Sequence, residues 1–268
     1  MNARVTDEPA FILHSYPWSE SSLILEAWSR HHGRVALVAK GAKKPTSQFR
    51  PVLLPLQPLR LSWGGDAEVR TLKAAHWPGG HVMPTGEALL SGYYLNELLM
   101  RLLVRDDPHQ ALFDHYTNAV RHLAEAAGSQ QAVLRTFELL LLRELGWLPG
   151  LHTLGNSAQP VAADTPCVLM PEGGLREALD GEAQALRGTI WLGLQQALDG
   201  PAPFDDTLLA CQPGLNALRP QLRTLLHYHS GVRVFKTRQM VLDVQALSVP
   251  AALPGALPVA DHPQARSE

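Results

Sequence analysis

Hydrophobic and polar residues alternate with a period of about two along the first part of the chain, up to about Trp77. Short apolar runs with this period, separated by turns such as His32-Gly33 and Gly64-Gly65-Asp66, predict β-strands. The link between the third and fourth runs is longer and contains several prolines. Five short strands with one long connection favour a Greek-key barrel of the OB type, and an SH3-like barrel is the nearest alternative. The predicted strands are residues 10–16, 22–29, 34–40, 59–63 and 68–75.

Beyond the segment 77–80, Trp-Pro-Gly-Gly, the period changes to about 3.6, which is typical of amphipathic helices. The pattern predicts a helix over 87–104, a second helix that begins at Asp107-Pro108, and a third that starts near Ser129 and ends at Gly146. Residues 148–166 are rich in Gly, Pro, Ser and Asn and are predicted to be irregular. A short strand is expected after them, and the later helices are residues 182–198 and 215–228.

These elements predict an α+β protein in which an N-terminal five-stranded OB-fold barrel precedes an α-helical bundle with a small irregular insert. We assign residues 1–78 to the barrel and residues 81–247 to the helical domain. Residues 248–268, in which Ala and Pro recur, cannot bury enough apolar surface to order themselves, so a disordered tail is expected there.

Composition limits where a polyanion could bind. The 268 residues carry a formal net charge of −2, so any affinity for nucleic acid must come from local patches. The two cysteines, Cys167 and Cys211, lie far apart in the sequence and fit reduced thiols in a cytoplasmic protein better than a disulfide framework. We find no signal peptide and no apolar segment of membrane-spanning length, and we therefore expect a soluble cytoplasmic protein.

Two stretches contain basic residues and no Asp or Glu, residues 30–50 and residues 207–242. A strand that leads into a cationic loop with Gly, Pro and Ser is a plausible contact surface for a polyanion, although an ordinary solvated loop has the same composition. Phe49, Trp63, Tyr16 and Trp18 would stack on bases if they faced outward, and would be core residues otherwise. The candidate DNA contacts are Arg34, Lys40, Lys43, Lys44, Arg50, Arg233, Lys236 and Arg238.

Catalytic and metal-binding signals are weak. The chain has no phosphate-binding loop, no dinucleotide-binding glycine pattern and no CxxC pair. The histidine pairs at 31–32 and at 227 and 229 are more typical of surface polar groups than of metal ligands. Asp205 and Asp206 are most simply explained as residues that complement the start of a helix. We therefore expect no enzyme activity, no cofactor and no metal site.

Several segments in a fixed order resemble the RecO family of bacterial DNA-repair and recombination mediators. They are PWSESSL at 17–23, GRVALVAKGA at 33–42 and GGDAEVRTL at 64–72, and then GYYLNELL at 92–99 and LRTFE at 134–138. The resemblance covers most of the first 147 residues, weakens between Leu148 and Gly214, and partly returns at residues 235–238.

This resemblance implies an OB-fold followed by a helical domain, and a non-enzymatic factor that binds single- and double-stranded DNA and anneals single strands. Such proteins act on strands coated by single-strand-binding protein and, with RecR, help load the RecA recombinase, so a nucleoid-associated protein is expected. Some members carry a four-cysteine zinc module, which this chain lacks the cysteines to build. The resemblance also implies a receptor for the acidic, Pro-Phe-ending tail of single-strand-binding protein, for which Arg121 and Arg135 are the candidates.

Two alternatives from other classes remain open from the residues. One is an RNA-binding OB module, which a comparison of single-stranded DNA with RNA would separate. The other is a protein-interaction scaffold whose basic loop only solubilises the chain, which would show no salt-sensitive DNA binding.

Overall fold

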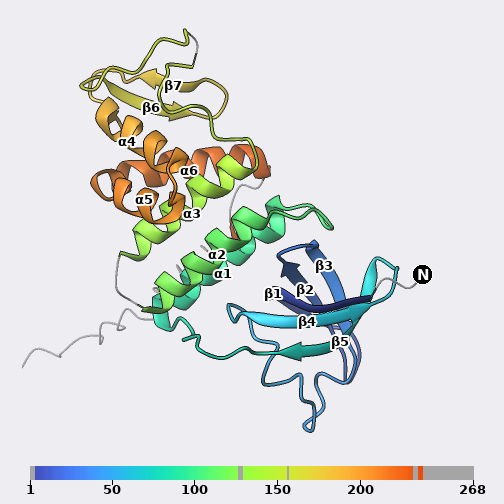
Figure 1. Ribbon diagram of the computed structural model, residues 1–268. Coiled ribbons are helices and arrows are strands. Elements are labelled where there is room, and N and C mark those ends of the chain that lie inside the picture. The colour runs from blue at the N-terminus through green and yellow to red at the C-terminus, as the bar shows by residue number, and fades with distance from the viewer. Residues whose placement is uncertain (1–3, 126–128, 156, 232–234, 238–268) are drawn as a thin grey trace, which may run out of the picture.

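The computed structural model describes residues 4–125, 129–155, 157–231 and 235–237 (Figure 1). Its N-terminal part is a closed barrel with the strand order β1-β2-β3-β5-β4, in which β3 and β5 are parallel and the other neighbouring pairs are antiparallel. This is the predicted five-stranded OB-type barrel. Its strands are β1 (Arg4–Pro17), β2 (Leu23–Ser29), β3 (Gly33–Ala39), β4 (Leu59–Gly64) and β5 (Val69–His76).

The barrel encloses its own apolar core. Alternate residues of each strand point inward, and among them Ile12, Leu25, Leu37, Leu61 and Trp63 are buried. β1 begins at Arg4, six residues before the predicted start, because its first residues pair with β4 in the register Arg4 to Gly64. A bulge in that pairing between Val5 and Glu8 bends β1, so that one long strand can pair with β4 at one end and with β2 at the other.

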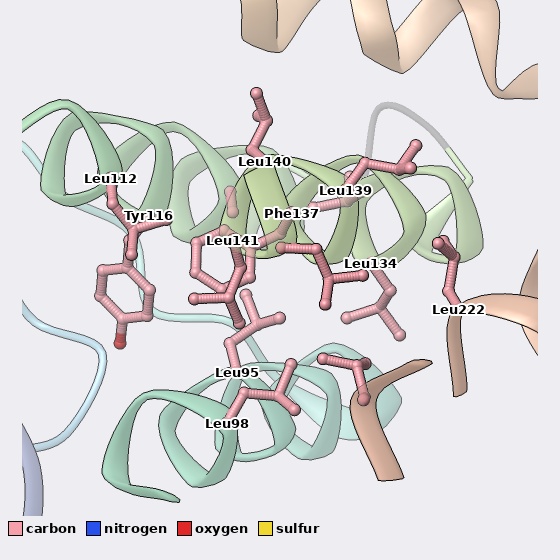
Figure 2. Packing of buried hydrophobic residues seen from close by; sticks show 14 of the residues in the cluster. Leu95, Leu98, Leu112, Tyr116, Leu134, Phe137, Leu139, Leu140, Leu141 and Leu222 are labelled. Atoms are coloured by element: carbon pink, nitrogen blue, oxygen red, sulfur yellow. The ribbon is translucent and has the colours of Figure 1, made fainter. Parts of the chain in front are cut away.

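Three helices follow the barrel and form the centre of the second domain. Leucines from the first and third helices and Leu222 from a later helix meet around Phe137 in a continuous apolar core (Figure 2). Residues 132–142 of the third helix are buried on all sides, as expected for a helix at the centre of a bundle. The helices are α1 (Gly86–Leu102), α2 (Gln110–Glu125) and α3 (Gln130–Glu144).

The remainder of the helical domain carries a small sheet at the end farthest from the barrel (Figure 1). Its strands have the order β7-β6-β8, with bounds β6 (Pro166–Met170), β7 (Gly174–Glu177) and β8 (Leu186–Arg187). Gln221 connects this sheet to the last helix: its side chain accepts the Leu169 N–H at 2.6 Å and donates to the Gln184 carbonyl at 2.7 Å. The other elements are α4 (Gly188–Asp199), α5 (Pro203–Ala210), the 3-10 helix η1 (Gln212–Gly214) and α6 (Leu215–Ser230).

Some predicted elements differ from the structure. Asp107 does not begin the second helix: α2 starts at Gln110, and the Asp107 backbone packs against β3 instead. The helix predicted over 182–198 starts at Gly188, because Leu186 and Arg187 pair with β6 as β8. Strands β7 and β8 were not predicted, and no bounds were predicted for helix α5, since each is too short to show a periodic pattern. Asp205 and Asp206, expected at the start of a helix, do lie in the first turn of α5. The expected tail, residues 248–268, lies outside the described residues.

The barrel and the helical domain meet at a tightly packed surface, which we call the junction. Phe11 and Trp28 of the barrel contact Phe113 and Tyr116 of α2, with ring centroids 4.9 to 5.5 Å apart. The Asn96 side chain of α1 donates a hydrogen bond to the Leu13 carbonyl of β1 at 3.1 Å. These contacts join the two domains through one apolar cluster.

At Gly33, the first residue of β3, the backbones of the two domains approach each other closely. It has a φ of +66°, and a Cβ atom at this position would lie 2.3 Å from the carbonyl oxygen of Asp107. The Asp106 N–H donates to the Arg34 carbonyl at 3.0 Å beside this contact. Gly33 is therefore required both by its left-handed conformation and by the close approach of the next domain.

Candidate nucleic-acid and peptide-binding sites

The basic loop, defined as residues 40–53, leaves the barrel after β3 and carries four of the predicted DNA contacts. It projects on the side of the barrel away from β6 and β7 (Figure 1). Successive turns order it, with the Lys44 N–H donating to Gly41 O at 3.1 Å and the Ser47 N–H donating to Lys44 O at 3.0 Å. Lys43 ties the loop to the β1–β2 turn, since its Nζ donates to the Ser19 carbonyl at 2.7 Å.

The four cations of the basic loop have no acidic partner. Their side chains are exposed, and within the described residues no salt bridge involves any of them. An exposed cation without a partner is hydrated and screened by counterions, which a phosphate can replace. The loop therefore offers an uncompensated positive surface, made of Lys40, Lys43, Lys44 and Arg50.

Two exposed aromatic side chains lie near this loop, Trp18 on the β1–β2 turn that Lys43 contacts and Tyr16 near the end of β1. Trp18 is 67% exposed and Tyr16 is 43% exposed. Trp63, by contrast, is 1% exposed in the barrel core, and Phe49 is half-buried in the basic loop. Of the four candidate aromatics, Trp18 and Tyr16 therefore expose rings on which a base can stack, and Trp63 is a core residue. The half-buried ring of Phe49 is only partly accessible.

Arg34 lies in the junction, away from the basic loop. Its side chain is 14% exposed, contacts Glu26 at 3.8 Å and donates to the Met100 carbonyl of α1. Burial lowers the pKa of the Arg34 guanidinium. We therefore remove Arg34 from the candidate DNA surface, because its charge serves the contact between domains and is not open to a phosphate.

Of the three basic candidates after α6, the structure describes Lys236, which lies on the helical domain. Lys236 is exposed, but its backbone N–H and that of Thr237 each donate to the Glu97 carboxylate of α1 at 2.8 Å. Phe235 is buried against Tyr94 and His227, with ring centroids 5.7 and 5.1 Å away. This segment is thereby fixed on α1, apart from the basic loop. Arg233 and Arg238 lie outside the described residues.

A cavity of about 330 Å³ opens between α1, α3 and α6, and we call it the helical pocket. Leu90, Leu134 and Phe235 supply apolar lining, while Arg219 and Arg223 of α6 supply positive charge at its wall. Arg135 and Glu138 of α3 also line it. A pocket with apolar walls and neighbouring arginines suits a ligand that combines a hydrophobic group with a carboxylate.

Arg135 and Glu138 form a buried ion pair at this pocket. The Arg135 Nη2 atom lies 2.7 Å from Glu138 Oε1, and the two side chains are 6% and 1% exposed. The Tyr94 hydroxyl donates to the same carboxylate oxygen at 2.7 Å, and burial raises the pKa of Glu138. The pair is therefore not an exposed contact between residues three apart on a helix. Because the pair is buried, the main role of Arg135 is to neutralise the Glu138 carboxylate, and contact with a ligand is secondary.

Arg121 does not share this pocket. It is exposed on α2, where its guanidinium donates to Asn118 at 3.2 Å, and it is absent from the pocket lining. Arg121 and Arg135 were both expected to face one slot between helices. Arg135 does line the helical pocket, but the prediction is wrong for Arg121. Arg219 and Arg223 lie in the second acid-free stretch, residues 207–242, but the sequence does not assign them to this pocket. The packing of α3 against α6 brings together residues more than eighty positions apart, which no local pattern records.

We also examined the described residues for reactive thiols, metal sites and membrane-spanning helices. Cys167 and Cys211 are both buried and free, and burial raises the pKa of each thiol, that of Cys211 to about 12. Among the described residues, no three His, Cys, Asp or Glu side chains gather into a group that could hold a metal ion. No helix in those residues combines the length and the hydropathy that a membrane crossing requires.

Comparison with known proteins agrees with the two-domain architecture. Residues 1–79 match the family described as recombination protein O N terminal, and residues 83–165 match recombination protein O C terminal. A DNA repair protein RecO of Polaromonas sp. strain JS666 is 61% identical over 245 residues, which span 91% of this chain and 98% of that protein. A DNA repair protein RecO of Variovorax paradoxus strain S110 is also 61% identical, over 253 residues and the same shares of both chains. The chain belongs to the RecO family of DNA repair proteins.

Proposed function

We propose that this protein is a non-enzymatic mediator of recombinational DNA repair that binds single- and double-stranded DNA and anneals complementary single strands. The observation that carries the proposal is the basic loop, whose four exposed cations form no salt bridge within the described residues, together with the exposed rings of Trp18 on the neighbouring turn and Tyr16 near the end of β1. The cations exchange counterions for phosphates, which gives affinity without sequence preference. The rings stack on bases, which favours single strands, because every base has a face that a duplex conceals.

Annealing requires two strands to approach each other with their repulsion screened. The basic loop holds one strand on the barrel. We assign the second contact to the cationic segment after α6, through Lys236, which is exposed on the helical domain. Arg233 and Arg238, which lie outside the described residues, belong to the same proposed contact by sequence.

The helical pocket is the proposed receptor for the C-terminal tail of single-strand-binding protein. The tail implied by the family resemblance is acidic and ends in Pro-Phe. Leu90, Leu134 and Phe235 would cover the phenyl ring, and Arg219 and Arg223 would pair with the carboxylates. By binding this tail, the protein would be recruited to single-stranded DNA that is already coated by single-strand-binding protein. In keeping with the family, RecR is the proposed partner in loading RecA, at the nucleoid in the cytoplasm.

A strand-annealing assay tests the DNA activity. The full chain should accelerate the pairing of complementary oligonucleotides that are coated with single-strand-binding protein. Trp18→Ala should weaken binding to single-stranded DNA by about fivefold or more, the lower end of what one stacked base contributes. Trp77→Ala is the matched control, because Trp77 is also an exposed tryptophan, 49% accessible, on the connection to α1. No annealing by the wild-type protein, or equal affinity for RNA and DNA with no annealing, would contradict the proposal.

Binding of a peptide with the tail sequence tests the helical pocket. Arg219→Ala with Arg223→Ala should lower peptide affinity by about tenfold or more, since each arginine makes a charge-assisted contact. Binding of bare single-stranded DNA should change little. Arg121→Ala is the control, the loss of one arginine charge outside the pocket. Arg135→Ala is a poor probe, because it leaves Glu138 buried without its partner. Unchanged peptide affinity in the double variant would exclude this pocket.

A further inference from the structure

A second, smaller cavity lies within the basic loop itself, and we call it the loop pocket. Its volume is about 230 Å³, and Leu23, Ala42, Phe49 and Leu53 supply its apolar lining. Lys43 and Arg50 complete the lining, and both side chains are exposed. An apolar recess with two exposed cations at its edge is therefore built into the surface that we assign to DNA.

The size and chemistry of the loop pocket restrict its occupant. Pockets that hold drug-sized ligands measure about 300 to 1,000 Å³, so this one suits a single ring system. The apolar lining favours a flat group that leaves water, and the cations favour negative charge attached on either side of that group. A nucleotide within a single strand has this composition, because each base is flanked by phosphates.

We propose that the loop pocket receives one unstacked base of a single strand, with Lys43 and Arg50 on the flanking phosphates. This inference rests on the proposed DNA binding and adds a base-binding subsite to it. A base in a duplex is stacked and paired on its Watson–Crick edge, so it reaches a recess only when it is turned out of the helix. The pocket therefore discriminates single strands from duplexes without reading sequence.

The surroundings of the pocket support a continuous path for the strand. Lys43, at the edge of the pocket, is fixed to the β1–β2 turn by its backbone N–H to Ser21 O at 2.9 Å and by its Nζ to Ser19 O at 2.7 Å. That turn carries Trp18 one residue before Ser19. One base in the pocket and another on Trp18 would leave the intervening phosphates beside the loop cations.

The test compares two oligonucleotides of equal length and charge, oligo-dT and a strand of abasic residues, in an anisotropy titration with the full chain. Wild-type protein should bind oligo-dT about fivefold or more tightly than the abasic strand. Ala42→Leu, which fills the recess, and Phe49→Ala, which removes one wall, should each reduce this preference while leaving abasic binding unchanged. Thermal melting of both variants shows whether the barrel is intact, and Trp18→Ala measures the base preference that arises outside the pocket.

The outcomes separate the subsite from DNA binding as a whole. If wild-type protein binds neither strand, the proposed function fails together with the subsite. If it binds both strands equally, or if the folded Ala42→Leu and Phe49→Ala variants keep the full preference for oligo-dT, DNA binding stands and the base subsite is wrong. Loss of tail-peptide binding in Ala42→Leu, with oligonucleotide binding unchanged, would assign the recess to a peptide side chain and would also overturn the proposal.

Discussion

The junction and the basic loop both draw their cations from one acid-free stretch, residues 30–50, yet they use them in opposite ways. In the junction, Arg30 pairs with Asp114 at 2.8 Å and Arg34 contacts Glu26 at 3.8 Å. In the basic loop, a few residues later, Lys43 and Arg50 form no salt bridge with any residue that the structure describes. The comparison teaches that a run of positive charge in the sequence becomes a binding surface only where the fold brings no carboxylate to it.

Burial explains why the junction needs its carboxylates. Glu26 is 4% exposed and pairs with Arg105, whose other partner, Glu68, lies on the surface at 2.7 Å. The hydrogen bond that Arg105 donates to the Glu26 carboxylate raises the pKa of the Arg105 guanidinium. A buried charge without a partner is costly, whereas an exposed one is solvated by water. The loop can leave its cations unpaired because all four are exposed.

The largest expected effect comes from removing the buried carboxylate of the junction. Glu26→Ala leaves Arg105 and Arg34 without their shared partner, and it should lower the free energy of unfolding by about 3–5 kcal/mol. Glu68→Ala removes the exposed partner of the same Arg105 and should cost about 0–1 kcal/mol. Urea denaturation of both variants measures the difference. If the two variants lose equal unfolding free energy, burial does not distinguish the Arg105–Glu26 contact from the Arg105–Glu68 contact.

A smaller effect is expected from the two glycines that mark the two regions. Gly33 and Gly41 have similar φ values, +66° and +72°, but a Cβ at Gly33 meets the Asp107 backbone, whereas at Gly41 the nearest atom is Lys44 Cδ at 3.7 Å. Gly41→Ala should cost about 1–2 kcal/mol, the penalty of the left-handed conformation. Gly33→Ala should cost about 1–3 kcal/mol more, because the overpacked junction has to shift. Chemical denaturation curves that coincide for the two variants would contradict this account of the junction.

The smallest expected effect on stability comes from Glu97, whose carboxylate accepts hydrogen bonds from the backbone of Lys236 and Thr237 after α6. Burial alone would raise its pKa, but hydrogen bonds from the Thr237 and Lys236 backbones hold the pKa of Glu97 below its ordinary value of 4.5. A lowered folded-state pKa contributes stability above pH 4.5, and this contribution disappears as the pH falls through the lowered value. Glu97→Gln should therefore cost about 1 kcal/mol at pH 7 and less in acid. If the difference in unfolding free energy between wild type and Glu97→Gln does not decrease in acid, this role of Glu97 is excluded. Glu87→Gln, at an exposed glutamate of the same helix, is the control.

The sequence predicted the barrel well because its signal is local. Alternating apolar residues and glycine turns specify all five strands, and the confirmed order places the long connection between β3 and β4. The helical domain was predicted less completely. β8 is two residues long and exists because β6 offers it a partner, which no local pattern records.

The candidate sites follow the same distinction. The loop cations could be proposed from the sequence because they lie in an acid-free stretch, but only the fold shows that no carboxylate of the described residues pairs with them. Arg34 could not be separated from them, because one of its partners, the Met100 carbonyl, comes from α1, more than sixty residues away. Arg219 and Arg223 join Arg135 only when α3 packs on α6, so the helical pocket depends on tertiary structure alone.

The most direct test of the central claim is the salt dependence of binding to single-stranded DNA. For the wild-type chain, the logarithm of the observed binding constant should fall linearly with the logarithm of salt concentration. The slope should flatten by about 0.7 for each phosphate contact that is lost. Changing Lys40, Lys43, Lys44 and Arg50 to Ala should weaken binding and flatten this slope, while Arg30→Ala, a junction cation paired with Asp114, should leave the slope unchanged. An unaltered slope in the folded loop variant, or an equal change from Arg30→Ala, would contradict the account.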